Sequence, residues 1–145
     1  MISDNHFANR FISSIPQDDY ELLAPFFRFS ELIKRTVIIE GGDQIEQVYS
    51  PHNGILSLVV VLQSGAAVEV AMVGSDGLFG ALSALDGKIS LNTAVVQIGG
   101  TGSVISTTDL RAVAAKSENF RGLLMRHEQV IFAQALRPPA PDPNH

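Results

Sequence analysis

Apolar residues near the start of the chain recur at the spacing of a helix. Within residues 5–15 they are Phe7, Phe11, Ile12 and Ile15. Pro16 then fits the first position of a second short helix, because a backbone N–H is not needed there, and acidic residues follow it in the first turn. This pattern predicts two small helices at the start of the chain.

From residue 36 the pattern changes to short runs that are rich in β-branched residues and closed by turn residues. These runs cover residues 36–40, 47–51, 55–62, 66–73 and 93–98. They predict strands, and the turn signals between them, the last at residues 99–102, recur at the spacing of a sandwich or jelly roll. Residues 77–85 break the strand pattern with helix formers and predict a short inserted helix.

The run at residues 66–73 has a regular alternation of its own. Val68, Val70 and Met72 alternate with Glu69 and Ala71. One face of this strand is therefore expected to be fully apolar while the other tolerates a charge, as on the wall of a barrel.

After residue 107 the helical pattern returns, and a longer amphipathic helix is expected to start near residue 117 or 118. Phe120, Leu124, His127 and Ile131 keep the 4-3-4 spacing of a coiled-coil seam. Either the barrel of the same chain or a second chain must cover this stripe, and the sequence leaves both alternatives open. Prolines at residues 138 and 139 end the helix, so residues 137–145 are expected to form a disordered tail.

Composition narrows the class of protein. The chain has 145 residues, of which 46% are hydrophobic, as expected for one domain with a sizeable core. With 15 acidic and 10 basic residues its net charge is -5, which argues against direct binding to DNA or RNA. The polar start is unlike a secretory signal, and the longest apolar run is shorter than the roughly 20 residues that span a bilayer. We therefore expect a cytoplasmic protein with no membrane role.

Candidate catalytic groups are sparse in the sequence. The absence of cysteine excludes disulfides, thiolate metal sites and thiol catalysis. The histidines, His6, His52, His127 and His145, are scattered singly and form no cupin-like metal motif. Glu40 and Asp43 flank two glycines and fit a turn better than a catalytic carboxylate pair. We expect no metal site and no enzymatic activity, and a cupin-type enzyme is the least favoured alternative.

Four short segments carry a resemblance to a known family. They are Ile-Glu-Gly-Gly-Asp-Gln-Ile at residues 39–45, Val-Tyr-Ser-Pro at 48–51, Val-Gly-Ser-Asp-Gly-Leu-Phe-Gly at 73–80 and Ala-Val-Val-Gln at 94–97. Through them the chain resembles, over residues 7–136, the sensor domain of Crp/Fnr-type bacterial transcription regulators. That domain is a cyclic-nucleotide-binding-like double-stranded β-helix.

The resemblance implies a mainly β fold, a jelly-roll-like barrel with short N-terminal helices and a C-terminal dimerisation helix. The implied domain covers residues 1–136, with N-terminal helices at 5–30, the barrel at 31–107 and C-terminal helices at 108–136. Its last helix would form a homodimer or a heterodimer through Phe120, Leu124, His127 and Ile131. A complete regulator continues into a helix-turn-helix domain that this sequence does not contain, so direct DNA binding is not expected.

The resemblance also implies a ligand site, the phosphate-binding cassette. In the family a Gly-Glu-Leu opens a short helix whose N–H groups face the phosphate, and an Arg-Ser/Thr-Ala follows on the next strand. The matching positions here are Gly80, Ala81 and Leu82, and then Asn92, Thr93 and Ala94. The glutamate and the arginine are therefore missing, and Lys88 is the nearby cation that could substitute. Tyr49 and Phe79 either pack in the core or line this pocket.

We therefore expect a regulatory domain in transcription control or signalling, with a degenerate nucleotide pocket and no cofactor. One alternative is a functional receptor for cyclic AMP or cyclic GMP that uses backbone N–H groups, Thr93 and Lys88. Another is a short partner that heterodimerises with a full-length regulator through residues 118–136 and blocks its DNA binding.

Overall fold

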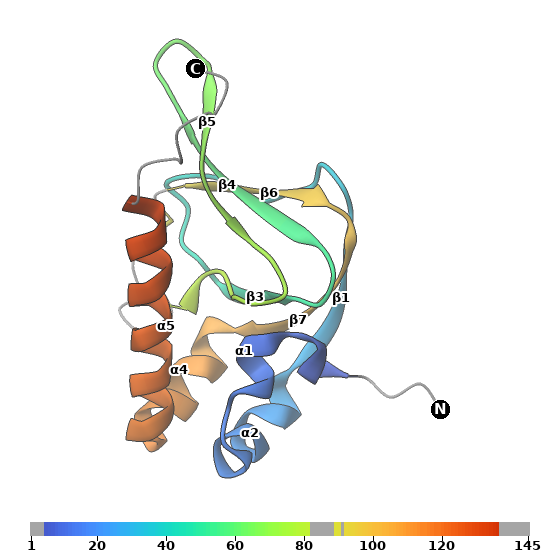
Figure 1. Cartoon of the computed structure of the whole chain (residues 1–145), viewed down its shortest axis with the longest axis vertical. Coiled ribbons are helices and arrows are strands. Elements are labelled where there is room, and N and C mark those ends of the chain that lie inside the picture. Colours follow the sequence, from blue (N-terminus) through green and yellow to red (C-terminus); the bar gives the residue numbers. More distant parts are fainter. Residues whose placement is uncertain (1–4, 82–88, 91, 137–145) are drawn as a thin grey trace, which may run out of the picture.

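Two antiparallel sheets face each other in the computed structural model, with helices below them and along one side in the view of Figure 1. The structure describes residues 5–81, 89–90 and 92–136, and the side chains of the last helix up to residue 127. The N-terminal helices are η1 (His6–Ala8), α1 (Arg10–Ser13), α2 (Gln17–Leu23) and η2 (Ala24–Phe26). The C-terminal helices are α4 (Thr107–Lys116) and α5 (Glu118–Leu136).

Seven strands lie between these two groups of helices in the described part of the chain. They are β1 (Arg28–Leu32), β2 (Val37–Ile39), β3 (Gln47–Pro51), β4 (Ile55–Val61), β5 (Ala67–Val73), β6 (Thr93–Ile98) and β7 (Gly100–Ser106). One sheet has the order β1-β7-β3 and the other β2-β6-β4-β5. The predicted mainly β architecture is confirmed, and the five predicted strands correspond to β2, β3, β4, β5 and β6.

The prediction was wrong at β1 and β7, which the sequence analysis assigned to a helical region and to a turn. The two strands pair with each other from Arg28 opposite Val104 to Leu32 opposite Gly100. A Cβ at Gly102 would lie only 3.3 Å from the Ser50 carbonyl oxygen, so glycine permits the close approach of β3 to β7. The helix after Pro16 is confirmed, with Pro16 as its N-cap residue instead of its first residue.

The apolar alternation of β5 does not produce one apolar face, because the strand contains a β-bulge. Leu58 of β4 pairs with Ala71 and Val59 pairs with Glu69, so Val70 between them has no partner. The bulge brings Glu69 onto the same side as Ser57, whose hydroxyl donates to the Glu69 carboxylate at 2.6 Å. Val68, Val70 and Met72 are exposed, as are Ala67 and Glu69, which corrects the expectation of a single apolar wall.

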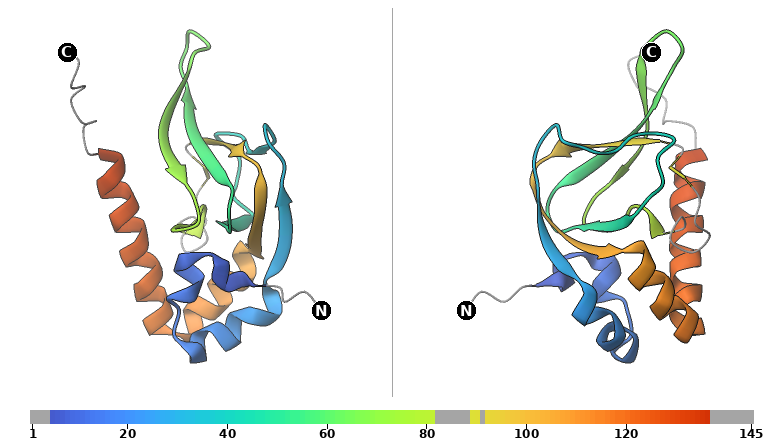
Figure 2. Two further views of the ribbon diagram at one scale, coloured as in Figure 1. Left: turned by 45° about the vertical axis from the view of Figure 1, so that its right-hand side comes forward. Right: turned by 180° about the vertical axis from the view of Figure 1, so that it is seen from behind.

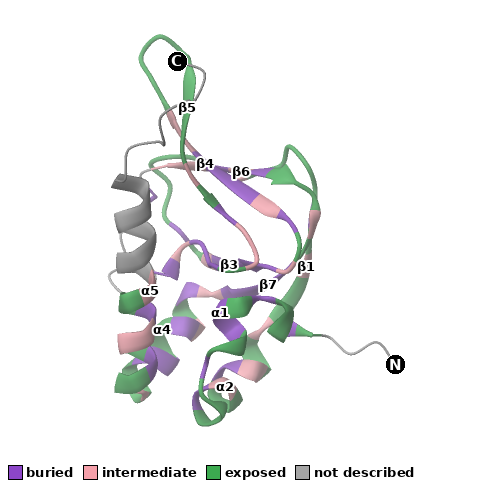
Figure 3. Ribbon diagram, in the orientation of Figure 1, coloured by how far each residue is buried: buried purple, intermediate pink, exposed green. Residues whose placement is uncertain are grey.

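The buried side chains form two clusters, shown in purple in Figure 3. One cluster lies between the sheets and includes Leu32, Ile45, Leu56, Phe79 and Val96. The other joins the helices to the β1-β7-β3 sheet and includes Phe11, Ile12, Leu23, Val48, Ile105, Phe120 and Leu124. The N-terminal helices and α5 therefore share one core beneath the sheets.

Asn9 anchors the N-terminal helices to the sheets. Its side-chain N–H groups donate to the carbonyl oxygens of Pro51 at 2.9 Å and Gly77 at 2.8 Å, and its Oδ1 caps α1 at the Ile12 N–H. The adjacent Arg10 N–H donates to the Ser75 carbonyl at 2.6 Å. Helix α1 therefore holds the turn that leads into Phe79 and the predicted cassette (Figure 2). Among the helices of the described residues, none has the length and hydropathy of a transmembrane span.

Candidate functional site

A cavity of about 450 Å³ opens between β2 of one sheet and β3 of the other. Its described lining consists of Ile38, Ile39, Asp43, Gln44, Ile45, Glu46, Gln47, Tyr49 and Phe79. The volume falls within the range of about 300–1,000 Å³ that is usual for small-molecule pockets. Tyr49 and Phe79, which the sequence assigned either to the core or to a pocket, lie on the cavity wall.

The start of the predicted cassette is fixed against β3. The backbones of Tyr49 and Phe79 exchange two hydrogen bonds, at 3.0 and 2.8 Å. Gly80 follows with a φ of 100°, a left-handed conformation that favours glycine. A Cβ at this position would lie 3.0 Å from Ile45 Cγ2 and 3.1 Å from the Gln47 carbonyl oxygen. Gly80 is therefore required for the close contact between the cassette and the residues before β3.

The other described residues of the predicted cassette are buried or hydrogen-bonded within the fold. Ala81 is 0% exposed and packs in the helix-side cluster, and Ala94 is 0% exposed between the sheets. Thr93 Oγ1 accepts a hydrogen bond from the Gly41 N–H at 3.0 Å. The Asn92 carbonyl oxygen accepts from the Ser90 hydroxyl at 2.6 Å. None of these four is part of the described cavity lining.

Two predicted members of the site, Leu82 and Lys88, lie outside the described residues, as does most of the helix expected at 77–85. The side chain of Ile131, a member of the predicted dimer seam, lies outside them too.

The charged groups of the described cavity lining are both acidic. Asp43 and Glu46 contribute carboxylates, and the described lining includes no lysine, arginine or histidine. The nearby Arg28 guanidinium donates to Gln47 Oε1 at 2.9 Å. Burial raises the pKa of the Tyr49 phenol, and Arg28 opposes that shift in part. Tyr49 is therefore a neutral phenol at physiological pH.

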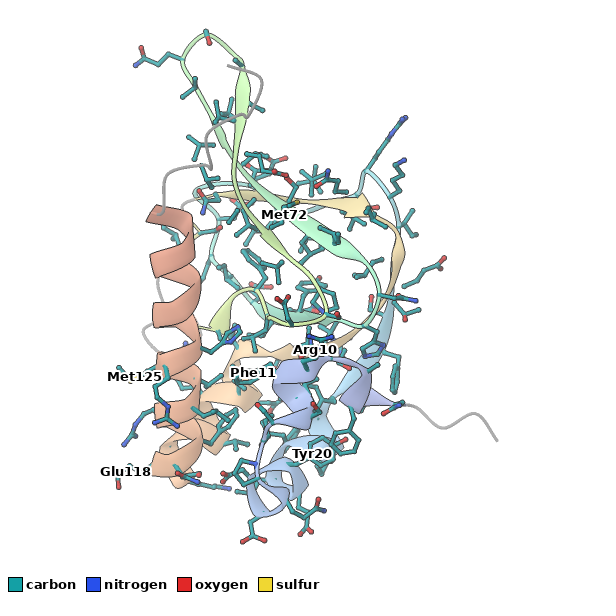
Figure 4. All side chains as sticks on the ribbon, viewed as in Figure 1. Arg10, Phe11, Tyr20, Met72, Glu118 and Met125 are labelled. Atoms are coloured by element: carbon teal, nitrogen blue, oxygen red, sulfur yellow. The ribbon has the colours of Figure 1, made fainter. Side chains whose placement is uncertain are left out.

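Helix α5 packs Phe120 and Leu124 of its predicted seam on its own chain. Phe120 and Leu124 are each 1% exposed in the helix-side cluster, which is the intramolecular alternative that the sequence left open. The His127 ring lies 4.8 Å from that of Phe11, between centroids. Burial lowers the pKa of His127, and Asp76 opposes that shift in part. Met125 is 48% exposed and projects from the outer side of the helix (Figure 4).

The fold brings together His6 and His52, which are 46 positions apart in the sequence. His52 Nε2 lies 2.6 Å from Ser103 Oγ, and His6 Nδ1 contacts the same buried oxygen. The His6 ring stacks on Phe29 at 4.0 Å between centroids. Sequence reasoning treated these histidines as isolated because β7, which carries Ser103, was not predicted. Across the described residues, no three histidine, aspartate or glutamate side chains are grouped to hold a metal ion.

Comparisons with known proteins agree with this architecture. A family model described as "Cyclic nucleotide-binding domain" matches residues 30–127. No curated protein matches the chain. The N-terminal domain of a transcriptional regulator from Streptomyces coelicolor is similar, with 18% identity and a TM-score of 0.68 over 90% of this chain and 92% of that one.

Two other solved structures are informative. A cyclic nucleotide-binding domain from Methylobacillus flagellatus has 14% identity and a TM-score of 0.72 over 88% of this chain and 78% of that one. A regulatory subunit of a cAMP-independent protein kinase A from Trypanosoma brucei has 17% identity and a TM-score of 0.65 over 92% of this chain and 45% of that one. The latter is a mutant bound to cAMP in its A site. At these identities the structures show a common fold.

Proposed function

Because the chain belongs to the cyclic nucleotide-binding domain family, whose members are typically regulatory and non-catalytic, we propose that it is a Crp/Fnr-class sensor domain whose pocket does not recognise a cyclic nucleotide. The observation that carries the proposal is the charge of the cavity between the sheets. Its described lining includes the carboxylates of Asp43 and Glu46 and no lysine, arginine or histidine that could pair with a cyclic phosphate. By its similarity to regulators, we place the domain in transcription control or signalling.

The two substitutions in the cassette support this proposal. Ala81 stands where the family has the glutamate that binds the ribose, and its methyl group is fully buried among apolar side chains. Asn92 stands where the family has the arginine that pairs with the phosphate. The loss of one charge-assisted hydrogen bond weakens binding by about 1.5–3 kcal/mol, so two losses weaken it by a few orders of magnitude. Thr93 accepts from the Gly41 N–H and keeps its own proton to donate to a phosphate, but a neutral hydroxyl does not replace the charge of the missing arginine.

The similar trypanosome structure offers a precedent for a domain of this fold in a cAMP-independent protein. The form that is bound to cAMP carries three substitutions, one of which replaces a threonine by arginine. We expect the same kind of change to favour cyclic nucleotide binding here.

Isothermal titration with cyclic AMP and cyclic GMP tests the proposal. We expect no saturable binding by the natural chain at millimolar nucleotide. Asn92→Arg should introduce measurable binding, and Asn92→Lys, which adds the charge without the planar fork, should introduce less. Micromolar binding by the natural chain would overturn the proposal. If neither variant binds a cyclic nucleotide, Asn92 alone does not account for the weak binding, and the substitution at Ala81 is tested next.

We also propose that the chain dimerises through α5, as a homodimer or with a related chain. Phe120 and Leu124 are already covered by the chain's own core, so the contact would use the outer side of the helix. Gly122 and Met125 lie on that side, and a small residue beside an exposed apolar one suits close helix packing. Sedimentation equilibrium tests this idea: Met125→Asp should weaken the dimer, while Met72→Asp on β5 should not. A natural chain that stays monomeric and captures no relative would contradict it.

A further inference from the structure

We infer that the cavity between β2 and β3 binds an organic cation with an apolar part, such as an amine or a guanidine. The inference rests on the proposed function, because it names the class of ligand that a pocket unsuited to cyclic nucleotides would sense. It is drawn from the charges, rings and amides that line the cavity.

The first step concerns the two carboxylates. Asp43 and Glu46 are exposed side chains at the wall of the cavity. Both carboxylates belong to the described lining, which contains no lysine, arginine or histidine. Their backbones are held in place: the Asp43 carbonyl accepts from the Ser90 N–H at 2.8 Å, and the Glu46 carbonyl accepts from the Thr107 N–H at 2.9 Å. Among the described residues, the site therefore presents two exposed carboxylates on a fixed backbone, with Arg28 hydrogen-bonded to the neighbouring Gln47.

The second step concerns the wall beside these charges. Tyr49 and Phe79 are joined by their two backbone hydrogen bonds and both line the cavity. An aromatic face attracts a cation within about 6 Å of its centroid, and the neutral Tyr49 hydroxyl can accept a hydrogen bond from an ammonium or guanidinium group. Ile38 and Ile39 supply apolar surface on the opposite strand. The wall thus suits a ligand that combines a positive group with a hydrocarbon part.

Other classes of ligand fit less well. An anion would approach Asp43 and Glu46 without a cation in the described lining to offset their repulsion. A bare metal ion would find these two carboxylates, but the described residues provide no third histidine, aspartate or glutamate ligand. The amides of Gln44 and Gln47 add neutral polar contacts that a cationic ligand tolerates.

Titration with probes of matched shape and opposite charge tests the inference. We would use 2-phenylethylamine and agmatine as cations, and 3-phenylpropionate as an anion with the same ring as the first. The cations should bind, more weakly at high salt, and phenylpropionate should not. The double variant D43N/E46Q should lose cation affinity by about tenfold or more, since each charge-assisted contact contributes about 1.5 kcal/mol or more.

The control variant D18N/E21Q removes the same number of charges from α2, away from the cavity, and should leave cation binding unchanged. Failure of both cations to bind at millimolar concentration would overturn the inference, as would equal binding by D43N/E46Q or by phenylpropionate. Cyclic AMP is titrated in parallel. Its binding would defeat the proposed function, whereas its absence together with absent cation binding would defeat only the inference about cations.

Discussion

Replacing Asn9 by alanine should destabilise the fold strongly, because this side chain is 0% exposed and joins three segments. Alanine removes the hydrogen bonds to the Pro51 and Gly77 carbonyls and the cap at the Ile12 N–H. At about 1 kcal/mol per bond the loss is about 3 kcal/mol, and buried groups left without partners raise it towards about 4 kcal/mol. The expected fall in melting temperature is about 10 °C for a chain of this size.

Urea unfolding followed by circular dichroism measures this loss, and two variants sharpen it. Asn5 also caps a helical turn, accepting from the Phe7 N–H at 3.1 Å, but it is exposed, so Asn5→Ala should lose no more than about 1 kcal/mol. Asn9→Asp keeps the cap acceptor and loses both amide donors, so it should be at least as unstable as Asn9→Ala. If Asn9→Ala and Asn5→Ala were equally stable, the assignment of Asn9 as an anchor would be refuted. A stability of Asn9→Asp equal to that of the unmutated protein would refute it too.

Three further predictions concern stability. Burial lowers the pKa of His52, so its neutral form is favoured in the fold and the free energy of unfolding should fall as the pH drops below about 6.5. The urea midpoints at pH 8 and pH 5 should therefore differ less in His52→Gln than in the unmutated protein. Gly80→Ala should destabilise the fold by about 1–3 kcal/mol, because Gly80 has a left-handed φ and lies in tight contact with Ile45 and Gln47. Gly42 also has a left-handed φ but has open space around it, so Gly42→Ala should destabilise less. Equal losses would contradict the close packing at Gly80. Phe120→Ala should destabilise the fold by about 3–5 kcal/mol in calorimetry, whereas Met125→Ala should change the stability little. The reverse order would show that the face of α5 with Met125, and not the face with Phe120, packs on the core.

The strands that could be predicted from the sequence are those whose own residues favour a strand. Runs such as 55–62 are rich in β-branched residues and are recognisable without their neighbours. The sheet partners β1 and β7 have no such signal: Phe29 and Glu31 of β1 are both exposed, and β7 begins with Gly100 and Gly102. Glycine in a short polar stretch fits a turn, and only the neighbouring strands reveal that it serves close strand packing.

The candidate site was predictable only in part, for the same reason. Tyr49 and Phe79 were named from the sequence as residues of either the core or a pocket, and both line the cavity, whereas Ala81 and Thr93 are not part of its described lining. The acidic character of the cavity could not be predicted, because Asp43 fits a turn in the sequence and only the structure shows that it lines one cavity with Tyr49 and Phe79. The face of β5 was also unpredictable, since the bulge at Val70 leaves no mark in a regular alternation.

The contact of His6 and His52 with one serine links the hydrogen-bonding roles of the two rings. The Ser103 hydroxyl carries a single proton, so it can donate to only one of the two imidazoles, and the other ring must hold a hydrogen on the nitrogen that faces Oγ. At least one of the two facing nitrogens, His6 Nδ1 or His52 Nε2, therefore carries a hydrogen, and an exchange of roles between the rings needs proton movement on the imidazoles as well as rotation of the hydroxyl. A change of hydrogen-bonding role at one ring therefore constrains the role that is open to the other.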